Sequence, residues 1–155
     1  MSATARRGRE LAPDLLERLR GRLAASTPLG LLGASLEEVA LDRAVLKLPY
    51  RKEITNGSGT VHGGILATLG DTAIAFALAT NFDGRMGFAT SDLTIHFLRR
   101  ARGDVWARAR IVKKGERVSV GEVEVVGADG TEVARVLASF VLTTSSFDYA
   151  PERDS

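Results

Sequence analysis

The chain has 155 residues, of which 45% are apolar and 26% charged, a composition typical of one globular domain. It contains no cysteine, which excludes disulfides, thiolate metal sites and a cysteine nucleophile. Its two histidines are too few for a His-rich metal site, so we expect no bound metal. The net charge of +2 is too small for a general nucleic-acid binder.

The two ends of the chain differ in composition from its middle. We expect residues 1–10 to be disordered, residues 11–145 to form a single domain, and residues 146–155 to be a flexible tail. No uninterrupted apolar segment follows the first arginines, so the N-terminus does not read as a secretory signal. We expect a cytoplasmic protein.

The longest apolar stretch, residues 65–80, is interrupted by polar residues. Thr68, Asp71 and Thr72 break it, and we expect it to be too short to span a bilayer. The sequence therefore predicts no membrane association.

The first predicted elements are a helix and a hairpin. Between residues 12 and 24, leucines recur at helical spacing with arginines on the other face, which predicts an amphipathic helix ending at Pro28. Residues 36–41 and 44–49 read as two strands joined by a tight turn.

The rest of the chain predicts a buried helix followed by strands. A glycine-rich loop at residues 56–64 leads into a helix at 65–80, which is apolar nearly all round and therefore buried. Four strands follow, at residues 87–98, 104–114, 117–126 and 132–143. This order predicts an α+β fold in which a curved antiparallel sheet wraps around one long central helix, with a short helix at the N-terminus. One protomer would leave an open sheet edge, so we expect it to pair.

Asp71 is the chemically most informative residue. It is a lone carboxylate within the apolar helix, and burying an ionised group is costly unless it is paired or used. Burial raises a carboxyl pKa towards neutrality, which suits a general base. A carboxylate can also attack a carbonyl directly, and both roles stay open.

The glycines before this helix suggest a second functional group. In His62-Gly63-Gly64, the backbone can turn tightly and leave peptide N–H groups pointing outward at the helix start. Such donors, with the helix dipole behind them, suit a developing oxyanion. Residues 63 to 71 of a helix span about 12 Å, too far for both groups to act on one carbonyl, so the catalytic unit should be a dimer.

Together these residues resemble a known family. The pattern Asn56-x-x-Gly59-x-x-His62-Gly63-Gly64, with Asp71 after it and Phe97-Leu98-Arg99 downstream, is similar to that of the hotdog-fold acyl-CoA thioesterases of the phenylacetate-degradation (PaaI-like) type, in the 4HBT superfamily. The resemblance covers about residues 11–143 and implies a hotdog fold that hydrolyses acyl-CoA to free acid and coenzyme A. One departure is Arg100, where the family usually has proline.

The resemblance also assigns roles to single residues. It implies that the Gly63 amide, with help from Asn56, polarises the thioester carbonyl, and that Asp71 of one subunit faces Gly63 of its partner. It gives His62 a supporting role and places at Thr90 a hydroxyl that positions the attacking water. It further implies a homodimer as the catalytic unit and a homotetramer overall.

Coenzyme A would be part of the substrate, and no other cofactor is implied. A basic stretch between Arg99 and Arg117 would attract its phosphates. We take Arg99, Lys114 and Arg117 as the candidate ligands. The acyl group stays open between aromatic and short-to-medium fatty acyl groups.

Two alternatives share the same fold. The chain could bind acyl-CoA without catalysis, although binding alone needs no buried carboxylate. It could also be a hydratase or dehydratase, but that chemistry usually calls for a close Asp–His pair, and His62 and Asp71 are poorly placed on one chain to form it.

Overall fold

The computed structural model describes residues 10–85 and 87–143. The predicted tail at 146–155 and nearly all of the predicted disordered start lie outside these ranges. The chain forms, in order, α1 (Leu15–Ser26), α2 (Pro28–Leu31), β1 (Ser35–Ala40), β2 (Arg43–Leu48), η2 (Lys52–Ile54), α3 (Gly63–Ala79), η3 (Thr80–Phe82), β3 (Phe88–Phe97), β4 (Val105–Lys114), β5 (Val118–Gly127) and β6 (Glu132–Leu142).

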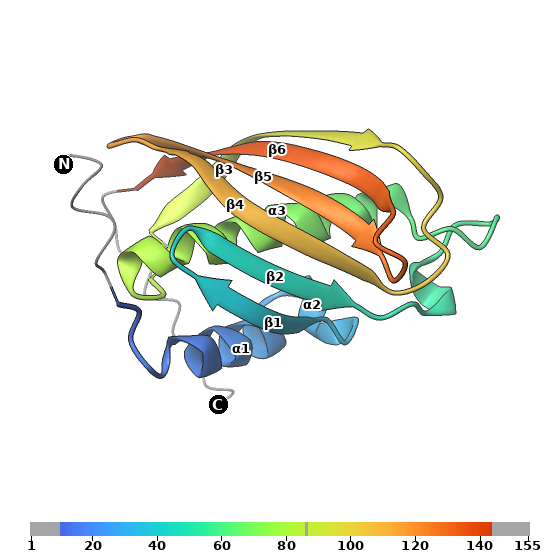
Figure 1. The fold of residues 1–155 in the computed structure, drawn as a ribbon, viewed down its shortest axis with the longest axis horizontal. Coiled ribbons are helices and arrows are strands. Elements are labelled where there is room, and N and C mark those ends of the chain that lie inside the picture. Colours follow the sequence, from blue (N-terminus) through green and yellow to red (C-terminus); the bar gives the residue numbers. More distant parts are fainter. Residues whose placement is uncertain (1–9, 86, 144–155) are drawn as a thin grey trace, which may run out of the picture.

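The strands form one six-stranded antiparallel sheet in the order β1-β2-β4-β5-β6-β3. The sheet curves around α3, and α1 and α2 lie next to β1 (Figure 1). The predicted architecture, a curved antiparallel sheet around one long helix with a short N-terminal helix, is confirmed.

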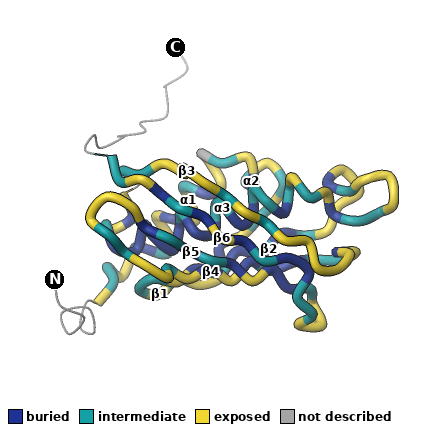
Figure 2. The backbone as a smooth tube through the Cα atoms, turned by 90° about the horizontal axis from the view of Figure 1, so that it is seen from above, coloured by how far each residue is buried: buried dark blue, intermediate teal, exposed yellow. Residues whose placement is uncertain are grey.

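The central helix α3 is buried because it is apolar nearly all round. Its buried side chains face the inner side of the sheet, where alternate residues of β2, β4, β5 and β6 are also buried (Figure 2). The segment Gly63–Phe82 is long and apolar enough to cross a membrane by length and composition, so the expectation that it is too short was wrong. Most of it is nevertheless buried inside the fold.

Small residues let the helix and the sheet approach closely. A Cβ added to Gly70 would lie 2.6 Å from Cγ2 of Val136 on β6. A Cβ added to Gly121 on β5 would lie 2.3 Å from Cγ2 of Ile74. Both distances are far below van der Waals contact, so α3 is locked against the sheet at two levels along its length.

The two edge strands of the sheet differ in whether another element covers them. α1 packs against β1, and the Arg20 guanidinium donates to the Leu36 carbonyl at 2.9 Å. At the other edge, β3 pairs with β6 alone, and within the described residues no element pairs with its outer side. A ten-residue edge strand with one open side is a ready site for pairing with another chain.

Three short elements were not predicted as helices: α2, η2 and η3, the last of which directly continues α3. Pro28 follows the end of α1 at Ser26, as predicted, and is also the first residue of α2, where proline suits the first turn and the Thr27 side chain accepts from the Gly30 amide. The second is η2, a single 3-10 turn in what the sequence suggested was loop.

A matched pair of glycine substitutions tests the close packing of α3. Gly70→Ala should destabilise the fold by about 1–3 kcal/mol, because the new methyl overpacks against the stiff Val136 side chain. Gly21→Ala, in the middle of α1 with nothing within 4 Å of the added Cβ, should instead stabilise by about 1 kcal/mol. Urea unfolding measures both, and a stabilising Gly70→Ala would contradict the packing.

Candidate active site

The loop before α3 is held by its own side chains. Asn56 Oδ1 accepts from the amides of Ser58 at 3.0 Å and Thr60 at 3.2 Å, an Asx-type turn. The Tyr50 hydroxyl donates to the Gly59 carbonyl at 2.7 Å. The Asn56 side chain therefore shapes the loop through its oxygen, while the residue also lines the cavity beside Gly63.

His62 is the N-cap of α3. Its Nδ1 accepts from the Gly64 amide at 2.9 Å, and its own amide donates to the Ile54 carbonyl at 2.8 Å. Because Nδ1 accepts in this contact, the imidazole supports the helix start. The structure thus gives His62 a positioning contact.

Gly63 is the first residue of α3, so its amide has no intrahelical acceptor. It lines a cavity of about 430 Å³ together with Asn56, Leu66 and Phe97. A Cβ at position 63 would lie 2.8 Å from Cζ of Phe97, whose ring is 56% exposed. Glycine is therefore needed for the ring to pack over the helix start.

Asp71 lies on α3, half-buried, and faces the edge strand. The Thr90 hydroxyl on β3 donates to Asp71 Oδ1 at 2.7 Å. Burial raises the pKa of the Asp71 carboxyl above its usual value, and the hydrogen bond from Thr90 lowers that pKa in part. The structure therefore brings two of the predicted residues into direct contact.

The structure does not bring Gly63 and Asp71 together. They lie on the same helix, about 12 Å apart along its axis. Gly63 contacts Phe97 at the end of β3, whereas Asp71 contacts Thr90 near the start of the same strand. Each group therefore stands at a different end of the open edge.

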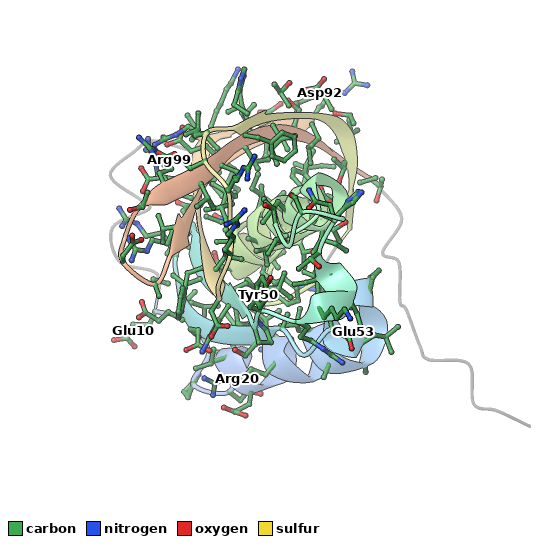
Figure 3. The ribbon with its side chains drawn as sticks, turned by 90° about the vertical axis from the view of Figure 1, so that its right-hand side faces the viewer. Glu10, Arg20, Tyr50, Glu53, Asp92 and Arg99 are labelled. Carbon is green, nitrogen blue, oxygen red and sulfur yellow. The ribbon has the colours of Figure 1, made fainter. Side chains whose placement is uncertain are left out.

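The three basic residues predicted to bind phosphates also fall into two places. Arg99 lines the Gly63 cavity, at the end of the molecule that faces the viewer in Figure 3. Lys114 Nζ lies 5.3 Å from the ring centroid of Phe82, just beyond the other end of α3. Arg117, at the β4–β5 turn, accepts through its carbonyl from the Leu142 amide. Within one chain, Lys114 and Arg117 do not share a site with Arg99.

Two cavity residues were not singled out as site residues from the sequence. Phe97 entered only as part of the resemblance, and Arg100 only as a departure from it, but both line the cavity beside Gly63. No local sequence pattern marks them, because a tertiary contact brings them to the helix start. In this contact the Val61 amide donates to the Ala101 carbonyl at 2.8 Å.

A curved antiparallel sheet around one central helix, with glycines at the helix start, defines a hotdog-fold protein. The structure of the Escherichia coli PaaI protein from the phenylacetic acid degradation operon superposes with a TM-score of 0.79, covering 88% of this chain and 99% of that chain at 22% identity. A thioesterase family protein from Silicibacter pomeroyi gives a TM-score of 0.75 at 25% identity, covering 83% of this chain and 98% of that chain.

The sequence places the chain within this fold. The profile of the thioesterase superfamily matches residues 58–134. A Halobacterium salinarum protein, provisionally named an esterase, is 41% identical over 123 residues, which cover 72% of this chain and 82% of that protein. The acyl-coenzyme A thioesterase PaaI of E. coli is 36% identical over 93 residues, covering 59% and 64%. The chain belongs to the thioesterase superfamily and is of the PaaI type.

The burial of Asp71 has a consequence for stability. Its folded-state pKa is raised, so its contribution to stability is present below the unfolded pKa and is lost as the pH rises through the folded pKa. Asp71→Asn cannot ionise and should therefore melt at a higher temperature than wild type at pH 7. The difference should shrink as the pH falls below about 4, the ordinary Asp pKa.

Thermal unfolding followed by circular dichroism across this pH range measures the effect. Asp129→Asn is the control, because the Thr131 amide lowers the pKa of this exposed turn carboxyl, so that its ionised form is favoured by folding. That variant should not gain stability at pH 7. An Asp71→Asn protein that melts at or below wild type at pH 7 would show that burial does not disfavour the charge.

Proposed function

We propose that this protein hydrolyses acyl-CoA thioesters in a site shared by two copies of the chain. One observation carries the proposal: Gly63 and Asp71, which would supply the oxyanion donor and the base for thioester hydrolysis, contact opposite ends of the same edge strand, β3.

The geometry of β3 explains how two half-sites would combine. If β3 pairs antiparallel with β3 of a second copy, the start of one strand lies beside the end of the other. Thr90 is near the start and Phe97 at the end, so each Asp71 would be brought towards Gly63 of the partner subunit. A two-fold dimer would then contain two equivalent sites.

In such a site the thioester carbonyl oxygen would accept from the Gly63 amide. The positive end of the α3 dipole favours the negative charge that develops on this oxygen. His62 supports this step indirectly, because its cap on the Gly64 amide fixes the helix start. The Phe97 ring, packed against Gly63, shields part of the donor from water.

Asp71 would act as the general base. The carboxylate takes a proton from water, the hydroxide oxygen forms a bond to the carbonyl carbon, and a tetrahedral oxyanion results. When this collapses, the carbon–sulfur bond breaks and the proton returns from the carboxyl to the departing thiolate. The raised pKa of Asp71 suits this exchange better than direct attack on the carbonyl does, and Thr90 orients the carboxylate.

Similar proteins support acyl-CoA as the substrate class. The E. coli relative and the human acyl-coenzyme A thioesterase 13, which is 28% identical over 104 residues, are both named for this activity. The two halves of the site fit it, because hydrolysis requires no group beyond an oxyanion donor and a base.

The direct test is free thiol release from a panel of acyl-CoA esters. Asp71→Asn should lower kcat by about 10²–10⁴-fold, the usual contribution of a general base. Asp129→Asn should leave the rate unchanged, because an amide oxygen can still accept from Thr131 in that turn. Full activity of Asp71→Asn would refute the mechanism, and tight binding of acyl-CoA by wild type without turnover would favour a non-catalytic binding protein.

A second test isolates the Gly63 amide. Gly63→Pro deletes the N–H, proline is tolerated at the first helical position, and His62 before it already has the extended conformation (φ −60°, ψ 135°) that proline requires. Gly63→Ala introduces a Cβ against the Phe97 ring as well but keeps the N–H. The proline variant should have a kcat about 10²–10³-fold below that of the alanine variant. Equal rates would exclude the amide from catalysis.

A further inference from the structure

Two arginines line the same cavity as Gly63. Arg99 and Arg100 lie just after β3, separated from its last residue by Leu98, and both are exposed. Arg99 is labelled in Figure 3, which looks onto this end of the molecule. None of the described residues that line this cavity carries a carboxylate, so the charge of this lining is positive.

The backbone of this arginine pair is anchored on both sides. The amides of Leu98 and Arg99 both donate to the Val133 carbonyl, at 2.9 and 3.2 Å. On the other side the Ala101 carbonyl accepts from the Val61 amide at 2.8 Å. Since Val61 lies just before the N-cap of α3, the position of Arg100 is fixed relative to the Gly63 amide.

The contacts of the two arginine side chains leave their charges without a carboxylate partner in the described part of the chain. Arg99 Nη1 donates to the Glu132 carbonyl at 2.9 Å, which restrains its side chain. The Glu132 carboxylate is bound by Arg135 at 2.7 Å. Within residues 10–85 and 87–143, neither Arg99 nor Arg100 forms an ion pair with a carboxylate. Two cations therefore border the cavity without a carboxylate partner among the residues that the structure describes.

We propose that Arg100, with Arg99 beside it, binds a phosphate group on the thiol side of the thioester. This inference rests on the proposed function, because a carbonyl held at Gly63 must extend its thiol half out of the cavity. A guanidinium fork matches a phosphate in geometry and charge. The shared chemistry is a phosphorylated pantetheine, carried either by coenzyme A or by the prosthetic group of an acyl carrier protein.

The test compares three thioesters of one acyl group: acyl-CoA, acyl-4′-phosphopantetheine and acyl-pantetheine. Arg100→Gln should raise the KM for acyl-CoA about tenfold with kcat nearly unchanged, since one charge-assisted contact contributes about 1.5–3 kcal/mol at most. The KM for acyl-pantetheine, which has no phosphate, should not change. A matching effect on acyl-4′-phosphopantetheine assigns the arginine to the pantetheine phosphate, and an effect on acyl-CoA alone assigns it to the nucleotide.

A matched control is Arg43→Gln. Arg43 is an exposed arginine on β2 that borders a different hollow, away from Gly63. It should leave all three KM values unchanged. If Arg100→Gln changes the KM for acyl-CoA and acyl-pantetheine equally, or changes neither while wild type is active, the phosphate site is refuted.

Calorimetric binding of coenzyme A and of pantetheine separates this inference from the catalytic proposal. Even if no thioester is hydrolysed, Arg100→Gln should weaken coenzyme A binding about tenfold and leave pantetheine unaffected. Equal affinity of wild type and Arg100→Gln for coenzyme A would overturn the inference regardless of activity.

Discussion

The fixed length of one rigid helix governs the whole arrangement. Gly63 and Asp71 are held about 12 Å apart along α3, and the helix cannot bend to bring them closer, because Gly70 and Ile74 are locked into the sheet. In the proposed mechanism the same helix carries an oxyanion donor at its start and a base along its side, and neither would reach the substrate atom on which the other acts. A second copy would then complete each half of the site. The open edge at β3 supplies the surface on which that copy can pair.

The burial of Asp71 affects both the pKa of its carboxyl and the stability of the fold. The apolar surroundings that stabilise α3 disfavour an ionised carboxylate, and this raises the pKa of Asp71. The hydroxyl of Thr90 offsets part of that shift and fixes the direction of the carboxylate. Under the proposed mechanism, stability and activity oppose each other at Asp71, as is common where a fold retains a reactive group in its interior. At the helix start no such conflict arises. His62 and Asn56 accept hydrogen bonds from the Gly64 and Ser58 amides, while the Gly63 amide has no intrahelical acceptor.

Much of the fold follows from local patterns in the sequence. The buried helix and the strands are signalled by apolar periodicity, and a lone charge within an apolar helix singles out Asp71. The features that local patterns do not reveal depend on contacts between residues that are far apart in the sequence or on the orientation of one side chain. Arg100 enters the site through the contact of Val61 with Ala101, and His62 becomes a cap through one orientation of its imidazole. Within one chain, Lys114 and Arg99 lie apart for the same reason, because strand β4 carries the chain from one end of α3 to the other before Lys114 is reached.

The shared site is tested most directly by mixing two inactive proteins. Gly63→Pro keeps the carboxylate and Asp71→Asn keeps the amide, so a heterodimer of the two has one site with both groups intact and one with neither. With random exchange in an equal mixture, about a quarter of wild-type activity should return, because half of the dimers are mixed and half of their sites are complete. If mass spectrometry shows that mixed dimers have formed and activity stays at the level of the separate variants, the two groups do not act together across an interface, and the account of the site is wrong.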